Sequence, residues 1–247
     1  MKGLYHLKIA PADIARFVLL PGDPQRSAFI ADKFLEKSRP INAYRGLDAY
    51  TGFYHGTRVS VVTSGMGSPS AGIVVEELSR LGVKVIIRAG TCGGVSKQIK
   101  PGDIVIPTGA GSMTGFKDAY GIGDVPSVPD FSVLERLVRF AGAGTGGKPR
   151  GHTTAFHVGP IMTSDAFFAE KGDAKLLESK GILAMEMECA AVFSLGHVLG
   201  MKTGALLLAT GNINYAEQVM DTPRIKSAMD SMLAISLKVL KDLSLEP

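Results

Sequence analysis

Short runs of apolar, often β-branched residues alternate along this chain with longer segments in which apolar residues recur every three or four positions. The first pattern is typical of strands buried on both faces, and the second of helices that cover a sheet. We therefore expect an α/β fold, with a central mixed or mostly parallel β-sheet covered by helices. The expected strands are Phe17–Leu20, Val59–Thr63, Val83–Arg88, Ile104–Pro107, Val158–Thr163 and Thr203–Ala209, and the expected helices are Asp23–Phe34, Pro69–Leu81, Phe131–Ala141, Ala174–Lys180, Glu188–Leu199 and Pro223–Leu243.

The second of these helices has recognisable ends. Pro69 lies in its first turn, where its missing N–H costs nothing, and Ser68 precedes it as a candidate N-cap. Gly82 follows its last apolar residue, as a C-terminal glycine does. The expected helix therefore runs directly into the next strand.

Two of the expected strands lead into small, glycine-containing segments that carry an arginine. Arg88–Gly94 reads Arg-Ala-Gly-Thr-Cys-Gly-Gly after a buried strand, and Pro21–Arg26 follows the first strand. Backbone N–H groups in such a turn, together with a guanidinium group, bind anions. The two segments predict one shared site of the size of a phosphate.

Composition narrows the class of protein. A chain of 247 residues with 45% hydrophobic and 20% charged residues fits a single domain, here 1–247, better than two. A net charge of +4 without basic runs argues against nucleic acid as a partner. Two cysteines give no disulfide framework, and no apolar segment is long enough to span a membrane, so we expect a cytoplasmic protein that is not bound to a membrane.

Two motifs resemble known sites without their required context, and the histidines show no pattern of a metal site. Gly142–Lys148 matches part of a P-loop, but Pro149 replaces the metal-binding hydroxyl and the segment follows a helix. Gly65–Gly67 lacks the third glycine of a dinucleotide fingerprint, and we interpret it as a tight turn that lets backbone approach a ligand. No metal site is expected, because histidines 6, 55, 152, 157 and 197 show no ligand spacing.

Glu186 and Glu188 are two carboxylates at the expected start of a helix. One interpretation is that the helix dipole stabilises these acidic side chains at a helix start. The other is that they accept hydrogen bonds from a diol such as ribose, with the neighbouring methionines as an apolar wall. Upstream, Phe167 is placed to stack on a flat heterocycle, whereas for Phe168 we expect a position in the core.

Taken together, six short motifs resemble the nucleoside phosphorylase family, which contains hexameric bacterial purine nucleoside phosphorylases and uridine phosphorylases. The resemblance runs nearly end to end. Enzymes of this family attack C1′ of a nucleoside with inorganic phosphate and release the base and ribose 1-phosphate. The motifs are Pro21–Arg26, Tyr44–Gly46, Gly65–Ser70, Arg88–Gly93, Ser164–Phe167 and Glu186–Glu188.

The resemblance implies a role for individual residues. It implies catalytic roles for Arg26, Arg88, Glu188 and Arg224. Phosphate would be held by Gly22, Arg26, Arg88 and Thr91, with Arg45 from the neighbouring subunit. The ribose would contact Met187, Glu188 and His6 of the partner subunit. The base would be surrounded by Cys92, Gly93, Phe167, Glu186, Thr210, Gly211 and Asn212. The sharing of residues implies a homo-oligomer, a dimer at least and a trimer of dimers by analogy, with phosphate as co-substrate and no cofactor.

The base is the open question. Purine enzymes of the family carry a Ser-Asp pair where this chain has Thr210-Gly211, followed by Asn212. The residues that recognise uracil in uridine phosphorylases of the family are also absent. This chain has other residues at those positions, namely Lys171 and Asp173 after Phe167, and Ile213 after Asn212. The short loop before Met185, together with Gly46 and Arg224, favours purines. Asn212 could then pair with a 6-oxopurine, which favours inosine and guanosine over adenosine.

Other functions stay open at this point. Uridine phosphorylase has the same chemistry, and a methylthioadenosine phosphorylase differs only in the 5′ group. A nucleosidase would use water, but it would not need Arg26, Arg45 and Arg88. A non-catalytic nucleoside-binding protein is a further alternative.

Overall fold

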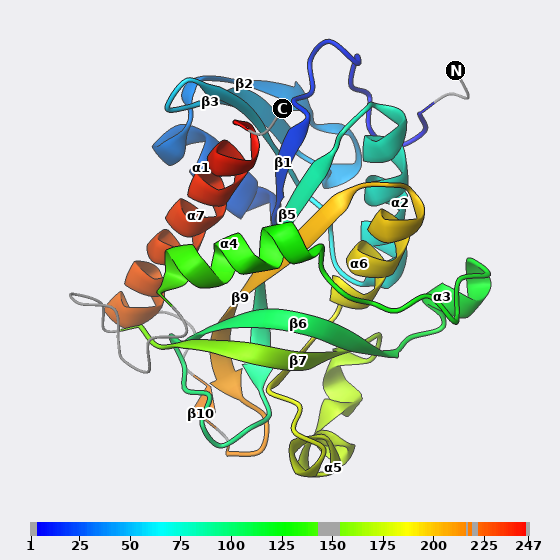
Figure 1. Ribbon diagram of the computed structural model, residues 1–247, viewed down its shortest axis with the longest axis vertical. Helices are drawn as coiled ribbons and strands as arrows, with labels where there is room; N and C mark the ends of the chain where they lie inside the picture. The colour runs from blue at the N-terminus through cyan, green and yellow to red at the C-terminus, as the bar shows by residue number, and fades with distance from the viewer. Residues whose placement is uncertain (1–3, 143–153, 216, 219–221, 246–247) are drawn as a thin grey trace.

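The computed structural model describes residues 4–142, 154–215, 217–218 and 222–245, which form a mixed sheet with helices on both faces (Figure 1). Within these residues the strand order is β10-β9-β6-β7-β8-β5-β1-β4-β3-β2, and β9 also pairs with β5. The strands are β1 (Phe17–Leu20), β2 (Glu36–Asn42), β3 (Ala49–Tyr54), β4 (Thr57–Val62), β5 (Val85–Gly94), β6 (Ile104–Met113), β7 (Phe156–Ser164), β8 (Ala184–Glu186), β9 (Lys202–Asn212) and β10 (Glu217–Gln218). The helices are α1 (Pro24–Phe34), η1 (Tyr44–Gly46), α2 (Ser68–Arg80), α3 (Phe116–Ala119), α4 (Phe131–Ala141), η2 (Phe167–Gly172), α5 (Ala174–Ser179), α6 (Cys189–Val198) and α7 (Pro223–Leu243).

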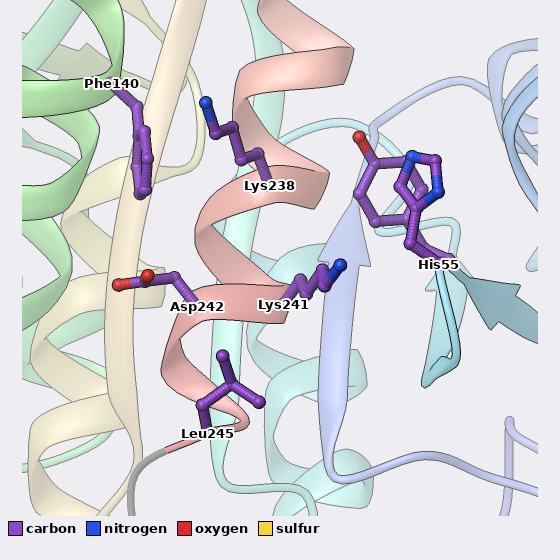
Figure 2. Close-up of a pocket in the computed structure, with 7 residues that line it drawn as sticks. His55, Phe140, Lys238, Lys241, Asp242 and Leu245 are labelled. Carbon is purple, nitrogen blue, oxygen red and sulfur yellow. The ribbon is translucent and has the colours of Figure 1, made fainter.

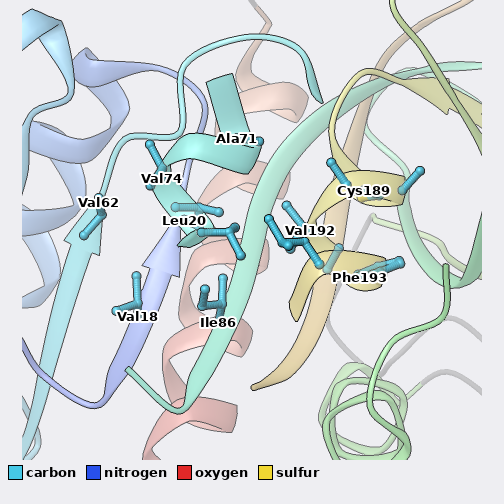
Figure 3. Packing of buried hydrophobic residues seen from close by; sticks show 14 of the residues in the cluster. Val18, Leu20, Val62, Ala71, Val74, Ile86, Cys189, Val192 and Phe193 are labelled. Atoms are coloured by element: carbon cyan, nitrogen blue, oxygen red, sulfur yellow. The ribbon is translucent and has the colours of Figure 1, made fainter. Parts of the chain in front are cut away.

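The central strands are buried on both faces because successive side chains point in opposite directions. Val18, Leu20 and Ile86 join the cluster under α2 and α6, which Figure 3 shows. Leu19 and Ile87 face the other way and pack with residues of α4 and α7. Consecutive apolar residues in β1 and β5 are therefore all needed in the core.

Five of the strands close into a ring. β5 pairs with β9 along its length, β9 continues to β6, and β7 and β8 lead back to β5. The parallel pair of β1 and β5 places Leu20 opposite Arg88. The end of β1 and the middle of β5 therefore lie side by side, as the two arginine-bearing segments predicted.

The segment Arg88–Gly94 is not the turn that we expected. It continues as strand β5, which pairs in parallel with β9 from Val85 to Gly94. Its small residues are explained by close packing: a Cβ on Gly90 would lie 2.7 Å from the Arg88 guanidinium group, and one on Gly93 would lie 2.8 Å from Ile213. The glycines make room for side chains rather than for a bend.

Other element boundaries show what sequence patterns miss. β2, β3, β8 and β10 were not predicted, while α4 and α7 have the predicted bounds. The N-cap of α2 is Gly67 and not Ser68, whose hydroxyl donates instead to the Met187 carbonyl. Gly82 follows α2 with a φ of 87°, as expected.

Helix α4 ends at Gly142 with a φ of 64°. The rest of the Gly142–Lys148 motif lies outside the described residues, as does His152. Among the helices that are described, none combines the length and apolar character needed to cross a bilayer.

Candidate active site

Arg88 is the centre of a buried charge cluster. Its side chain is 3% exposed and lies between two carboxylates. Nε donates to Glu186 at 3.2 Å, and Nη2 donates to Glu188. Nη1 is buried and has no hydrogen-bond partner among the described residues. A buried guanidinium nitrogen without a partner costs free energy, so this nitrogen marks a place for an acceptor from outside the chain.

The unpaired nitrogen lies beside the turn after β1. A Cβ built on Gly22 would be 3.9 Å from Arg88 Nη1 and 3.8 Å from the Ser64 hydroxyl. Arg26, in the first turn of α1, donates from Nη1 to the Ala89 carbonyl at 3.3 Å. The structure thus brings together Gly22, Arg26 and Arg88, three of the residues predicted to bind phosphate. Thr91, a fourth, is half-buried three positions further along β5.

Glu188 is held by the turn that precedes α2. Its Oε1 accepts from the Gly67 backbone N–H at 2.7 Å, and its other oxygen accepts from Arg88. Gly65 and Gly67 have φ values of 69° and 84°, a backbone region that favours glycine. The Gly65–Gly67 segment is therefore the tight turn that we predicted, and here it positions a carboxylate. Met187, between the two glutamates, is half-buried.

Glu186 is hydrogen-bonded on both carboxylate oxygens to other groups of the chain. Its Oε1 accepts from the Thr163 hydroxyl at 2.6 Å, and its carboxylate also accepts from the backbone N–H groups of Glu188 and Cys189. The two backbone donors belong to the N-cap and the first residue of α6, so Glu186 satisfies free N–H groups at a helix start. With Arg88 Nε as a further donor, both oxygens are occupied. We therefore do not retain Glu186 as a base-contacting residue.

The cluster perturbs the acids and bases within it. Burial alone would lower the pKa of Arg88, but the Glu188 and Glu186 carboxylates raise it above its usual value. Burial raises the pKa of Glu188, although Arg88 opposes this. Burial lowers the pKa of Arg26, and the nearby charge of Arg88 adds to the effect. Two arginines in a desolvated site attract an anion that relieves their mutual repulsion.

The residues predicted around the base come from the paired ends of β5 and β9. The register of this pair shifts by one residue, so that Cys92 lies opposite Ala209 and Gly93 opposite Gly211. Thr210 is the extra residue of this bulge, and its half-buried hydroxyl lies 3.5 Å from the Cys92 carbonyl. Bulges of this kind re-aim side chains beside active sites. Cys92 itself is buried, and burial raises the pKa of its thiol.

Asn212 has a different environment from the one predicted. Its amide nitrogen donates to the carbonyls of Ser96 and Ile99, and its oxygen accepts from the Asn214 N–H. The side chain is 3% exposed. The amide holds the loop after β5 in place, so we do not retain it as a base reader.

Arg224 is likewise engaged away from the Arg88 cluster. Its Nη2 donates to Asp103 at 2.8 Å, and its side chain covers Gly102, where a Cβ would lie 2.8 Å from Nε. Asp103 also pairs with His157 at 3.0 Å. In this arrangement Arg224 fixes the start of α7 to the start of β6.

The aromatic pair lies in η2 and is exposed. Phe167 is 58% exposed and Phe168 is 98% exposed, with their ring centroids 5.2 Å apart. Phe167 is exposed enough to stack on a ligand, and its stacking on a base stays a prediction. The prediction that Phe168 fills the core was wrong, because a helix turn follows β7 where we assumed continued packing.

His6 and Arg45, the residues expected from a partner subunit, lie in surface segments. Arg45 is exposed in η1 with a φ of 60°, and its guanidinium group lies 5.7 Å from the Tyr44 ring centroid. His6 is half-buried and is hydrogen-bonded to Glu77 on α2. Neither makes a hydrogen bond to the Arg88 cluster among the described residues.

A cavity of about 350 Å³ is lined by residues that do not belong to the Arg88 cluster. It lies between the turn after β3 and the end of α7 and is lined by Tyr54, His55, Phe140, Lys238, Lys241, Asp242 and Leu245 (Figure 2). Lys238 lies over the Phe140 ring, 4.5 Å from its centroid. None of the predicted site residues lines this cavity. In the part of the chain that the structure describes, no cluster of His, Cys, Asp or Glu could hold a metal ion.

Comparison with known proteins decides the family. A sequence profile of the phosphorylase superfamily matches residues 16–241. The chain belongs to this superfamily. The resemblance seen in the six motifs is therefore confirmed. Gly65–Ser70, Arg88–Gly93 and Glu186–Glu188 each contribute a residue to the Arg88 cluster, and Arg26 of Pro21–Arg26 lies beside it.

Curated relatives of the chain cover nearly its whole length. A purine nucleoside phosphorylase, DeoD-type, from Clostridium novyi is 38% identical over 95% of this chain and 98% of the relative. One from Myxococcus xanthus is 35% identical over 95% of both chains. A guanosine phosphorylase from Halorubrum lacusprofundi is 35% identical over 84% of this chain and 83% of the relative.

The fold has a solved counterpart. A uridine phosphorylase from Vibrio fischeri ES114, complexed with 6-hydroxy-1-naphthoic acid, superposes with a TM-score of 0.85 over 98% of this chain and 97% of that one. The identity is 23%, so the match concerns the fold. The nucleoside phosphorylase-like fold that we predicted is confirmed.

Proposed function

We propose that this protein is a nucleoside phosphorylase that cleaves 6-oxopurine nucleosides, such as inosine and guanosine, with inorganic phosphate. The observation that carries the proposal is the buried, unpaired Nη1 of Arg88 beside Gly22. Phosphate supplies the acceptor oxygens that this nitrogen lacks, and Arg26 lies within reach of the same space. The names of the curated relatives support a purine as the base, and the name of the guanosine phosphorylase among them supports a 6-oxopurine.

The reaction forms a bond between a phosphate oxygen and C1′ of the ribose and breaks the bond from C1′ to the base. The bonding electron pair leaves with the base, which gains the proton that hydrogen phosphate loses on becoming an ester, and ribose 1-phosphate is the second product. Positive charge develops on the sugar, and the bound phosphate is both the nucleophile and the counter-charge. Arg26 and Arg88 hold the phosphate, and Glu188 orients the ribose through its hydroxyl groups.

The base binds at the joined ends of β5 and β9 in this proposal. Phe167 is exposed enough to stack on a purine ring, and the Thr210 hydroxyl offers a hydrogen bond from the bulge. Both belong to the set predicted around the base, from which we no longer include Asn212 and Glu186. The proposed reaction takes phosphate as co-substrate and no cofactor.

The active unit is a homo-oligomer in which His6 and Arg45 complete the site of a neighbouring subunit. Exposure of the η1 segment that carries Arg45 supports this arrangement. A dimer is the smallest complete unit, and the family resemblance extends it to a trimer of dimers.

The test is the release of free base from inosine, guanosine, adenosine and uridine, each with and without inorganic phosphate. We expect phosphate-dependent cleavage that is fastest for inosine and guanosine. Cleavage of uridine alone would contradict the purine assignment and leave the phosphate site intact. A rate that does not depend on phosphate would indicate a hydrolase instead.

A further inference from the structure

A buried threonine joins β7, β8 and α6 at the Arg88 cluster. Thr163 is fully buried on β7, and the parallel pairing of β7 with β8 places it opposite Glu186. Its hydroxyl group donates to Oε1 of Glu186 at 2.6 Å and accepts from the backbone N–H of Ala190 in α6 at 2.9 Å. Both directions are fixed, because a carboxylate accepts hydrogen bonds and a backbone N–H donates them. The hydroxyl group therefore has one defined orientation, set by β8 on one side and α6 on the other.

The guanidinium group of Arg88 is held at two of its three nitrogens. Nε donates to Oε2 of Glu186 at 3.2 Å, and Nη2 donates to Glu188. The backbone of Gly90 packs against the same group, since a Cβ there would lie 2.7 Å from Nη2. A guanidinium group is planar and rigid, so two anchored nitrogens fix the position of the third. The unpaired Nη1 is thereby held beside Gly22.

The two glutamates that anchor Arg88 are themselves held differently. Glu188 accepts from the backbone N–H of Gly67, in the turn before α2. Glu186 accepts from backbone N–H groups two and three residues further along the chain. Apart from Arg88 itself, the Thr163 hydroxyl is the only donor to Glu186 among the described residues that is more distant in the sequence. Thr163 therefore sets where the Glu186 carboxylate lies relative to the rest of the sheet.

We propose that Thr163 is a positioning residue for phosphate. Through Glu186 it holds the guanidinium group of Arg88 in the orientation in which Nη1 meets the phosphate. Its own hydroxyl group is already engaged on both sides, so it acts through Arg88 and without contact to the substrate. The nucleoside depends on it far less, because Glu188 keeps its hydrogen bond to Gly67. The inference rests on the proposed function, because it needs phosphate as the substrate that Arg88 binds.

The experiment compares the KM for phosphate with the KM for inosine. Thr163→Val nearly keeps the shape of the side chain and removes the hydroxyl group. We expect the KM for phosphate to rise about tenfold, since Glu186 loses a hydrogen bond and Arg88 loses its fixed orientation. The KM for inosine, measured at saturating phosphate, should stay within about twofold of the wild-type value, because Glu188 remains anchored. A merely structural role would lower kcat through the amount of folded protein and leave both KM values unchanged.

Two further variants separate the hydroxyl group from the shape of the side chain. Thr163→Ser keeps the hydroxyl group, so its KM for phosphate should lie within about twofold of the wild-type value. Thr51→Val is the matched control. Thr51 is 4% exposed on β3 and accepts from the Ser60 hydroxyl at 3.1 Å, with no hydrogen bond to the Arg88 cluster among the described residues. The same chemical change there leaves both KM values as they are in the wild-type protein.

Several outcomes would overturn the inference. They are an unchanged KM for phosphate in Thr163→Val, an equal rise of both KM values, and a KM in Thr163→Ser as high as in Thr163→Val. If Thr163→Val does not fold, Thr163→Cys replaces it. A thiol is a weaker donor than a hydroxyl group, so we expect the KM for phosphate to rise about threefold in that variant, with the KM for inosine unchanged. A wild-type KM for phosphate in Thr163→Cys would likewise overturn the inference.

Failure of the inference can be told apart from failure of the proposed function. A wild-type protein that releases hypoxanthine only with phosphate, together with an unaffected Thr163→Val, contradicts only the inference. A wild-type protein that releases hypoxanthine without phosphate, or not at all, contradicts the proposed function and the inference with it.

Discussion

At the scale of single residues, the cluster around Arg88 shows how one glutamate can support a site while the next one serves it. The sequence left two interpretations open for Glu186 and Glu188, a helix start or a ligand contact. The structure divides them: Glu186 satisfies the N–H groups of α6, and Glu188 faces the turn at Gly67. Spacing alone could not assign these roles, because both residues are next to the same helix end.

Arg88→Lys tests the residue at the centre. A lysine ammonium group is a point charge that cannot serve two carboxylates and a phosphate at fixed angles. We expect kcat/KM for phosphate to fall by about 10²-fold or more, with a raised KM for phosphate. Steady-state kinetics with varied phosphate measures this. Arg80→Lys, at an exposed ion pair, is the control, and unchanged phosphate dependence in Arg88→Lys would remove Arg88 from the site.

At the scale of elements, apolar patterns predicted the buried strands and the long helices but not the edge of the sheet. β1, α4 and α7 have the expected bounds because their apolar residues face a core. β2 has exposed residues at most of its positions, so it shows no apolar alternation. The sequence predicted that strand β5 ends at Arg88, because glycines that accommodate neighbouring side chains look like a turn in the sequence. The strand in fact continues to Gly94.

The contact of α4 with β9 depends on a missing side chain. A Cβ on Gly204 would lie 2.5 Å from Val133 and 3.1 Å from Leu137. Gly204→Ala should lower the free energy of unfolding by about 1–3 kcal/mol, because α4 must move outward. Chemical denaturation measures this against Gly115→Ala, where a Cβ meets nothing within 4 Å. Equal stability of the two variants would show that α4 does not rest on Gly204.

The start of α7 is tied to β6 by Asp103, which makes this contact sensitive to acid. Burial alone would raise the pKa of Asp103, but His157, the Lys100 N–H and Arg224 hold it below its usual value. Its contribution to stability is present above the unfolded pKa of about 4 and is lost as pH falls through the folded value. As the pH is lowered from about 5 to about 2, the melting temperature of Asp103→Asn should fall less than that of the wild-type protein, because the variant has no carboxylate to protonate at this position. Parallel curves would contradict this role.

At the scale of the whole molecule, the chain by itself brings together Gly22, Arg26 and Arg88, which we expect to bind phosphate, while His6 and Arg45 make no hydrogen bond to them among the described residues. The family and the fold were predictable from the six motifs, and four of these, Pro21–Arg26, Gly65–Ser70, Arg88–Gly93 and Glu186–Glu188, meet at the Arg88 cluster. The partners of Asn212 and Arg224 were not predictable, since each is bound by a loop distant in the sequence.

Mixing two inactive variants tests the sharing of sites. Arg45→Ala damages the residue given to a neighbour, and Arg88→Ala damages the residue kept in the chain's own site. Oligomers assembled from both after joint refolding should regain part of the wild-type activity, because some sites then hold neither change. Activity that stays at the level of the separate variants would mean that Arg45 and Arg88 belong to the same chain's site.

The central claim is that the unpaired nitrogen of Arg88 marks a phosphate that attacks the sugar. Phosphorus NMR of the reaction with inosine and inorganic phosphate tests this most directly, because it identifies the sugar product. We predict that the phosphate signal is replaced by that of ribose 1-phosphate in step with release of hypoxanthine. Release of hypoxanthine with free ribose, and an unchanged phosphate signal, would contradict the account.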